Sequence, residues 1–406
     1  MYILMKNLLF LLLLLVSISC SQDDEQFILR TSSKTISIKD GDEFYKNIWT
    51  ISPELELDEF IPQKTRGKKN VSFISDIDTI TFNVVPNNLY HFKVQFNGKN
   101  AFTCINTDTL KAETIPKRTI LEYYRNNKNE EVTTDTISFQ LGEDNGIHLK
   151  GTVNNSDELD FLFDTGANAI VIASELIGKK VNVQLNGTTN NKGSDGIQTT
   201  STSSGNKISI EGLNWDNVEL LAIDYQQPDF DGVLGWTAFE NKILEIDYEQ
   251  NIIIIHDSME SVPKDYIKIE TKIIDGVPYI KGVIEVNNKK TSGWFQYDSG
   301  SNGCFSLSQK FASEHNLNNA MEIVASSIST GSAGIEWKAN DYILPKLSFG
   351  SIELSSIPLS INESDPDGIE NNNLLGNNLL KRFNTIIDLK NFQIYFRTNS
   401  LLNSEF

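Results

Sequence analysis

FLFDTGA at residues 161–167 recurs in altered form as WFQYDSGS at residues 294–301, and this repeat is the most informative feature of the chain. In both copies an apolar run leads into an Asp-(Thr/Ser)-Gly tripeptide, with the acid at Asp164 or Asp298. The apolar run favours a buried strand, the glycine permits a tight turn, and the hydroxyl can donate a hydrogen bond beside the acid. Two such copies can bring their carboxyl groups together to share one proton, because like charges in contact do not both ionise.

The residues around the two acids repeat as well. A hydrophobic-hydrophobic-Gly step follows each acid, at Val233–Gly235 and at Leu374–Gly376. The same number of residues then separates Gly235 from Asp247 and Gly376 from Asp388. An internal duplication of roughly 130 residues is the simplest explanation of these shared spacings. Asp247 and Asp388 each follow isoleucine and precede a strand-like run, so we expect them at turns rather than in catalysis.

The rest of the chain favours an all-β fold with a few short helices. Short segments rich in Ile, Val, Phe and Thr are separated by turn residues, which include Asn-Gly at 97–98 and 145–146 and Asn-Asn at 287–288. This punctuation predicts mostly antiparallel strands joined by hairpins. Helical periodicity is confined to residues 309–317, 236–244 and 377–383.

The paired motifs and their downstream glycine segments resemble those of the aspartic peptidase clan, pepsin-like and retropepsin-like, and especially the retropepsin-like domains of bacterial lipoproteins. The resemblance covers about residues 136–403. It implies a bilobal pepsin/retropepsin-like acid protease barrel formed by the internal repeat, with lobe 1 at residues 136–262 and lobe 2 at residues 263–406.

The resemblance also implies an aspartic-type endopeptidase in which Asp164 and Asp298 form the catalytic dyad and activate a water. The residues that would support the active-site loops are Thr165, Gly166, Ser299 and Gly300. A peptide or protein would be the substrate, and neither a metal nor a cofactor is implied.

The clan has a β-hairpin flap that closes over the substrate. Two Gly-Ser-rich stretches are candidates for its tip, one between Gly193 and Gly205 and one that contains Gly331 and Gly334. Their spacing does not tell which of the two is the lid.

The first residues are typical of a targeting segment. Residues 1–19 carry Lys6, an apolar run and small residues, as a secretory signal does, and about a dozen apolar residues are too few for an ordinary transmembrane anchor. Cys20 follows directly and resembles the acylated cysteine of bacterial lipoproteins, which implies a lipid anchor in the cell envelope, at the outer membrane on its periplasmic or surface side. The acidic run Asp23–Glu25 fits a surface-export signal or a solvated tether equally well.

Residues 20–135 are expected to hold the lipid-attached tether, a small antiparallel β domain and a linker. Clean alternation of apolar and polar residues marks the strands of this domain between residues 71 and 105. A polar stretch at residues 123–135 predicts the linker. No chemistry can be assigned to the domain, for which a spacer or a substrate-docking module are the available roles.

Composition excludes several functions. The formal net charge of −19 argues against nucleic acid or an anionic membrane surface as a partner, because both require basic patches. The four histidines match no metal-ligand spacing. Cys104 and Cys304 lie in different predicted domains, and Cys304 is expected to be a buried structural thiol.

Two other functions stay open. Gln296 interrupts the apolar run before the second acid, so a non-catalytic lipoprotein that binds a peptide or glycan on the same fold is an alternative. A scaffold in an envelope complex, led by the N-terminal domain, is the third possibility.

Overall fold

The computed structural model describes residues 27–41, 43–55, 57–62, 69–86, 88–107, 121–125, 133–225, 228–274, 276–365 and 373–406. The expected signal, Cys20 and the acidic run lie outside these residues, as does most of the predicted linker. Within the described part of the chain, no helix is long and apolar enough to cross a membrane.

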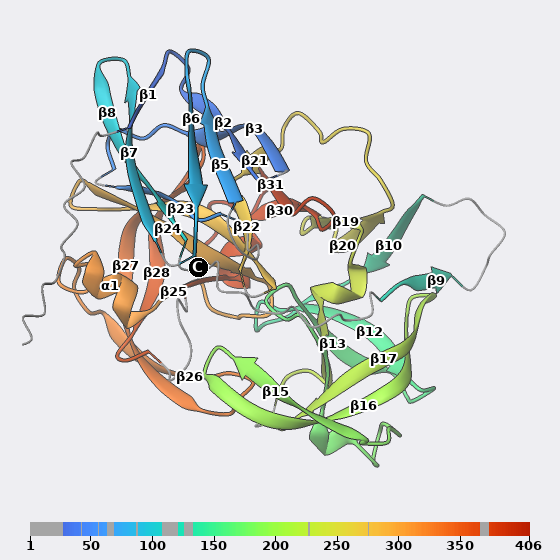
Figure 1. Ribbon diagram of the computed structural model, residues 1–406. Coiled ribbons are helices and arrows are strands. Elements are labelled where there is room, and N and C mark those ends of the chain that lie inside the picture. Colours follow the sequence, from blue (N-terminus) through green and yellow to red (C-terminus); the bar gives the residue numbers. More distant parts are fainter. Residues whose placement is uncertain are drawn as a thin grey trace, which may run out of the picture.

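The N-terminal domain consists of two four-stranded sheets (Figure 1). One sheet has the order β1 (Ile28–Thr31), β7 (Leu89–Phe96), β8 (Lys99–Asn106) and β4 (Asp58–Phe60), and the other has the order β3 (Glu43–Thr50), β2 (Thr35–Asp40), β5 (Lys69–Ile74) and β6 (Thr79–Val84). The pairings are antiparallel except at the short edge strands β1 and β4, which pair in parallel. Trp49, Phe73 and Phe92 are fully buried in the core of the domain.

Lobe 1 is a nine-stranded sheet. Its strands are β9 (Tyr123–Arg125), β11 (Gln140–Leu141), β12 (Ile147–Val153), β13 (Leu159–Asp164), β14 (Ile170–Ala173), β15 (Gly187–Gly193), β16 (Gly196–Ile210), β17 (Leu213–Ile223) and β18 (Gly232–Gly235). Strand β9 lies where the sequence predicted a linker, and it pairs with the start of β17. Its tyrosine Tyr123 packs on the buried ring of Trp215, which explains why this polar stretch joins the sheet.

Lobe 2 repeats this arrangement in an eight-stranded sheet. Its strands are β22 (Thr271–Ile274), β23 (Val277–Val286), β24 (Lys289–Asp298), β25 (Phe305–Leu307), β26 (Ala325–Thr330), β27 (Glu336–Phe349), β28 (Ile352–Asn362) and β29 (Leu374–Gly376). The turn between β23 and β24 is made by Asn287 and Asn288, both with positive φ, as the sequence predicted for this hairpin.

A third sheet of six strands joins the two lobes. Its order is β10 (Thr134–Ser138), β20 (Ile252–His256), β19 (Ile243–Asp247), β30 (Phe383–Asp388), β31 (Gln393–Thr398) and β21 (Ile267–Ile269). The lobes meet where β19 pairs with β30. The expectation of an all-β, bilobal fold built from an internal repeat is confirmed.

The helices are shorter than the sequence predicted. Helix α1 spans Gln309–Glu314, α2 spans Asn377–Leu380, and residues 236–239 form only a 3₁₀ turn. After each hydrophobic-hydrophobic-Gly step the chain makes one short turn before it enters the shared sheet as β19 or β30. The apolar residues that occur at helical spacing in these segments therefore do not form long helices. They are buried in short turns and at the first positions of the strands that follow.

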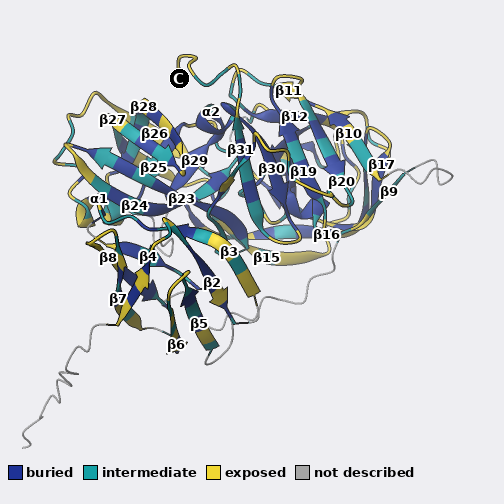
Figure 2. Ribbon diagram, turned by 90° about the horizontal axis from the view of Figure 1, so that it is seen from above, coloured by how far each residue is buried: buried dark blue, intermediate teal, exposed yellow. Residues whose placement is uncertain are grey.

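The N-terminal domain packs on lobe 2 near strands β23 and β24 (Figure 2). Lys281 Nζ lies 2.5 Å from Asp58 Oδ1 and 3.6 Å from the ring centre of Trp49, and both charged side chains are almost fully buried. Lys272 Nζ lies 4.2 Å from the ring centre of Phe60 and 4.5 Å from that of Trp294. A buried ion pair and an amine held between aromatic rings require close complementarity of the two surfaces. The N-terminal domain therefore packs on lobe 2 through a specific interface.

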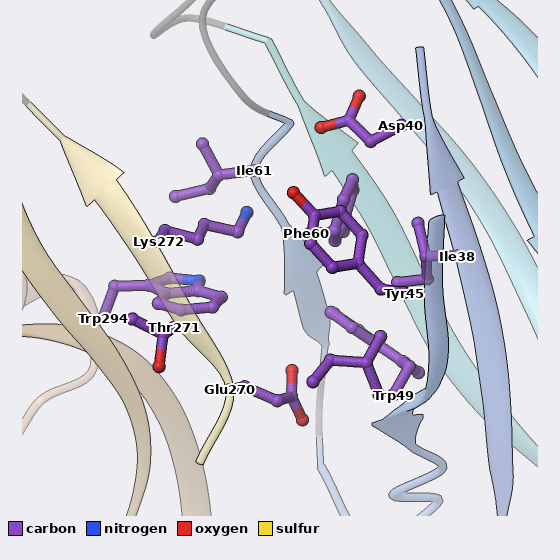
Figure 3. A pocket seen from close by; sticks show the side chains of 11 residues that line it. Ile38, Asp40, Tyr45, Trp49, Phe60, Ile61, Glu270, Thr271, Lys272 and Trp294 are labelled. Carbon is purple, nitrogen blue, oxygen red and sulfur yellow. The ribbon is translucent and has the colours of Figure 1, made fainter. Parts of the chain in front are cut away.

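A small cavity of about 40 Å³ remains in this interface (Figure 3). Aromatic side chains from both sides line it together with Lys272 and Glu270. Lys272 Nζ and Trp294 Nε1 are buried and have no hydrogen-bond partner among the described residues. Burial lowers the pKa of Lys272 well below its usual value.

Candidate active site

The two predicted acids occupy matching positions at the ends of matching strands. Asp164 ends β13 and lies opposite Gly235 of β18 in a parallel pairing, and Asp298 ends β24 and lies opposite Gly376 of β29. A Cβ on Gly235 would lie 2.2 Å from the carbonyl oxygen of Ala169, and one on Gly376 would lie 2.3 Å from that of Gly303. The hydrophobic-hydrophobic-Gly step thus leaves room for the loop that follows each acid.

The loop after each acid is held by the acid itself. Asp164 Oδ1 accepts hydrogen bonds from the backbone N–H groups of Gly166 and Ala167, at 2.7 and 3.1 Å. Asp298 Oδ1 accepts from those of Gly300 and Ser301, at 3.0 and 3.1 Å. One oxygen of each carboxyl is therefore fixed by backbone donors, which orients the whole group.

The two loops are tied to each other across the lobes. The Thr165 hydroxyl accepts from Ser299 N at 2.9 Å and donates to the carbonyl oxygen of Tyr297 at 2.8 Å. The Ser299 hydroxyl accepts from Thr165 N at 3.0 Å and donates to the carbonyl oxygen of Phe163 at 2.9 Å. Both hydroxyl groups are buried and fully used by backbone partners, so they hold the loops and are not free to act as nucleophiles.

These ties bring the two carboxyl groups into direct contact. Asp164 and Asp298 hydrogen-bond to each other, and burial raises the pKa of both. The negative charge of Asp164 raises the pKa of Asp298 further. Each acid also faces the opposite loop, because a Cβ on Gly166 would lie 2.6 Å from Asp298 Cγ and one on Gly300 would lie 2.3 Å from Asp164 Cγ. Two carboxyl groups in contact share one proton, because both do not ionise together. Asp164 and Asp298 are each only half-buried, so solvent can reach the pair.

Sequence reasoning missed the part played by Gln296. Its amide Nε2 donates to Asp298 Oδ2 at 3.4 Å, and its Oε1 accepts from the Tyr279 hydroxyl at 3.4 Å. The residue at the matching place in lobe 1 is Leu162, two residues before Asp164. The sequence contained a sign of this contact, since Gln296 breaks the apolar run. A polar residue two positions before an acid on a strand lies on the same face as that acid and can reach it.

Tyr225 is a second residue that the sequence did not single out. It follows β17 and packs against Phe230 with ring centres 5.1 Å apart, beside Ala167 and Val233. Burial raises the pKa of Tyr225, and the negative charges of Asp164 and Asp195 raise it further. Tyr225 therefore forms part of an apolar wall of lobe 1, beside the loop that follows Asp164.

Both flap candidates belong to hairpins, one in each lobe. Gly193 ends β15 next to the turn into β16, while Gly205 lies far from that tip, at an irregularity in the pairing of β16 with β17. Gly331 and Gly334 lie in the turn between β26 and β27. Figure 1 shows the hairpin of β15 and β16 reaching towards β26, so the two lobes approach each other here as well.

The residues that were set aside have other partners or are inert. Asp247 Oδ1 and Asp388 Oδ1 each accept from backbone N–H groups of the next turn, as expected for turn residues. His148 lies between Asp144 and Asp160, each within 3.1 Å of a ring nitrogen. Cys304 is buried, and burial raises the pKa of its thiol to about 12, which leaves it inert.

A known protein family matches part of lobe 1. Residues 149–238 match the family model described as aspartyl protease. That stretch contains Asp164-Thr165-Gly166 and the step Val233–Gly235. Residues 149–238 of lobe 1 carry an aspartyl protease family domain. Lobe 2 supplies the second copy of the motif, at Asp298-Ser299-Gly300.

Among solved structures, the crystal structure of the aspartic proteinase from Irpex lacteus is similar to this chain with a TM-score of 0.46 and 12% sequence identity. The similarity covers 67% of this chain and 99% of that chain. None of the curated proteins matches the chain.

Proposed function

We propose that this chain is an aspartic-type endopeptidase in which Asp164 and Asp298 act as one catalytic unit. The observation that carries the proposal is the contact between the two half-buried carboxyl groups, each oriented by two backbone N–H donors. A single buried acid supplies one proton-transfer group, whereas a pair that shares a proton supplies an acid and a base at once.

The chemistry follows from that shared proton. The ionised member takes a proton from a water as its oxygen attacks the carbonyl carbon of the peptide bond, and the protonated member gives its proton to the carbonyl oxygen. The tetrahedral diol then collapses, because a proton passes to the amide nitrogen and the C–N bond breaks. Because the two acids titrate as a unit, the roles belong to the pair. The buried hydroxyls of Thr165 and Ser299 keep the pair in register throughout.

The substrate would lie extended between the lobes, beneath the two hairpins. Extended peptides are recognised by backbone pairing and by pockets for alternate side chains. The wall formed by Tyr225, Phe230 and Ala167 beside Asp164 favours an apolar side chain at the scissile bond.

Loss of either acid tests the function. Asp164→Asn and Asp298→Asn should each abolish cleavage of an unfolded protein or a peptide library, measured by mass spectrometry of the products at acid to neutral pH. Asp157→Asn, a change at an exposed residue of lobe 1, is the matched control and should keep full activity. Full activity in either dyad variant would disprove the shared-dyad mechanism.

We also propose that the peptidase is held at the bacterial envelope by a lipid on Cys20. The supporting observation is the signal-like segment that ends directly before this cysteine. The full chain should fractionate with membranes, and Cys20→Ala should release it while the dyad activity stays. Retention of the variant in the membrane fraction would contradict the anchor.

A further inference from the structure

One face of the β23–β24 hairpin leads from the N-terminal domain to the second acid of the dyad. Residues that are paired directly across two antiparallel strands point to the same side of the sheet. Lys281 is paired with Trp294 in this way. Two residues further along, Tyr279 is paired with Gln296, and Asp298 then ends β24 on the same face. The acid therefore ends a row of side chains that begins about 13 Å away along the strand.

The N-terminal domain covers the beginning of this row. Its strand β4 lies against β24, and Asp58 of β4 binds the Lys281 amine at 2.5 Å. Phe60 of the same strand lies on one side of the Lys272 amine, and the ring of Trp294 lies within 4.5 Å of it. These contacts fix the domain at the end of the row that is farther from the dyad.

Ile61 extends the contact towards the dyad. It directly follows β4 and packs, half-buried, against an apolar cluster of lobe 2 that consists of Val277, Tyr279 and Trp294. Figure 3 shows Ile61 on the same side of the interface cavity as Lys272 and Trp294. Tyr279 is only 7% exposed. A side chain of the N-terminal domain therefore helps to bury an aromatic ring of the lobe that carries the second acid.

Tyr279 connects this cluster to the dyad through one amide. Its hydroxyl donates to Gln296 Oε1 at 3.4 Å, and Gln296 Nε2 donates to Asp298 Oδ2 at 3.4 Å. The place of the amide is also fixed by the loop after the first acid, because a Cβ on Gly166 would lie 2.7 Å from Gln296 Nε2. An amide has an acceptor at one end and a donor at the other. The tyrosine hydroxyl engages the acceptor end, which leaves the N–H groups facing the acid.

The start of β23 is held from the other side by lobe 1. The carbonyl oxygen of Gly276 accepts from Trp236 Nε1 at 3.0 Å. A Cβ on Gly276 would lie 3.1 Å from Asn168 Nδ2, so this turn also approaches the loop after the first acid closely. Tyr279 follows three residues later on β23. Its position is therefore set between lobe 1 and the N-terminal domain.

We propose that Ile61 and Tyr279 are positioning residues of the active site: the N-terminal domain, through Ile61, holds the Tyr279 ring, and the tyrosine hydroxyl turns the Gln296 amide towards Asp298. The proposal rests on the proposed peptidase function. If the amide turned round, its oxygen would face the carboxylate and repel the negative charge. The N-terminal domain is then more than a spacer or a substrate-docking module, because its docking completes the surroundings of one acid.

A nuclear magnetic resonance titration of the full chain tests this linkage without relying on catalysis. With glutamine side chains labelled with nitrogen-15, the Nε2 signal of Gln296 is the one that Gln296→Leu removes. This signal should move as the dyad titrates, and Ile61→Ala should reduce the movement by about half, because the amide is no longer held. A signal that does not move in the wild type, or that moves equally in Ile61→Ala, would overturn the linkage, whether or not the chain is a peptidase.

Ile48→Ala is the matched control. Ile48 is half-buried like Ile61 and lines the same interface cavity, but it packs in the core of the N-terminal domain and not against the Tyr279 cluster. The movement of the Gln296 signal should therefore stay as in the wild type. A reduction as large as in Ile61→Ala would assign the effect to a general loosening of the interface and overturn the role of Ile61.

Kinetics then test the positioning role. Ile61→Ala should lower kcat for a peptide substrate about fivefold and leave KM unchanged, because the amide acts on the acid and not on substrate binding. Ile61→Val keeps most of the packing and should behave nearly as the wild type. If the wild-type chain cleaves no peptide, the proposed function fails, and the titration still decides the linkage.

A double variant separates positioning from structural damage. In a chain that already carries Gln296→Leu, the change Ile61→Ala should lower kcat no further, because the amide through which it acts is gone. A merely structural defect would lower the amount of folded enzyme in both backgrounds alike. Losses that multiply in the double variant would therefore overturn the positioning role.

Discussion

Thr165 and Ser299 hydrogen-bond to each other in both directions, since the hydroxyl of each accepts from the backbone N–H of the other, at 2.9 and 3.0 Å. Each hydroxyl then donates to a backbone carbonyl of the opposite lobe. The lobes are therefore joined directly beneath the dyad by a symmetric pair of side chains, and the separation of the two acids depends on this joint.

Thr165→Val should weaken the joint without changing its volume much. The substitution leaves buried backbone groups of Ser299 and Tyr297 without their partner, so we expect a loss of about 1–3 kcal/mol in unfolding free energy and a strong drop in kcat. Chemical denaturation and peptide cleavage measure the two effects. Thr165→Ser keeps the hydroxyl and should behave nearly as the wild type. Equal effects of the two variants would contradict the role of the hydrogen bonds.

Gly166→Ala should inactivate the site by displacing the opposite acid. A methyl group there would lie 2.6 Å from Asp298 Cγ, so the carboxyl has to move away from its partner. We expect a fall in kcat of about a hundredfold or more, because misplacing a catalytic group by about 1 Å has this effect. Gly303→Ala in the corresponding loop of lobe 2 is the control, since its new Cβ meets only Ser301 Oγ at 3.8 Å. Comparable losses in both variants would argue against the contact.

Gln296→Leu should change the pH profile. The amide donates to Asp298 Oδ2 and so stabilises the ionised form of the dyad, which means that its removal raises the first pKa of the pair. We expect the acid limb of kcat/KM to move up by about half a pH unit. Tyr279→Phe, which frees the amide oxygen, should produce a smaller shift in the same direction. An unchanged profile in Gln296→Leu would show that the amide does not act on the dyad.

Asp58 and Lys281 should be strongly coupled in stability. Removal of one partner leaves the other charge buried, so Asp58→Asn or Lys281→Met alone should cost about 3–5 kcal/mol in unfolding free energy. The double variant should cost less than the sum of the single ones, as measured by denaturant unfolding of a double-mutant cycle. Additive effects would mean that Asp58 and Lys281 do not interact in the folded protein. A docked N-terminal domain predicts one cooperative transition for the whole chain.

Glu270 should make stability fall as pH rises. Burial raises its pKa to about 7 in the folded protein, above the ordinary value of 4.5. The folded state therefore holds the proton more tightly, and its contribution to stability is complete below about pH 4.5 and lost as pH rises through about 7. Glu270→Gln should reduce the decline in unfolding free energy between about pH 5 and about pH 8 by about 2 kcal/mol. An identical decline in the variant would contradict this origin.

Much of this architecture follows from local sequence. The repeat of apolar strand, acid and hydroxyl predicted two matching lobes, and the Asn-Gly and Asn-Asn pairs predicted their hairpins, because positive φ and alternation are local properties. The predicted helices came out shorter, since apolar spacing does not distinguish a helix from a core-facing turn that leads into a strand. The contact of Gln296 with Asp298 was not predicted, because it depends on which side chains share a face of β24.

Local patterns of residues were enough to predict the two acids, their loops and the alternation that builds each sheet, because those features depend on residues close together in the chain. Long-range packing established which groups meet: Asp58 with Lys281, and Asp195 with the amides of the opposite hairpin. The partners in these contacts are far apart in sequence. Whether they meet depends on the packing angles of whole sheets, which no local pattern of residues specifies.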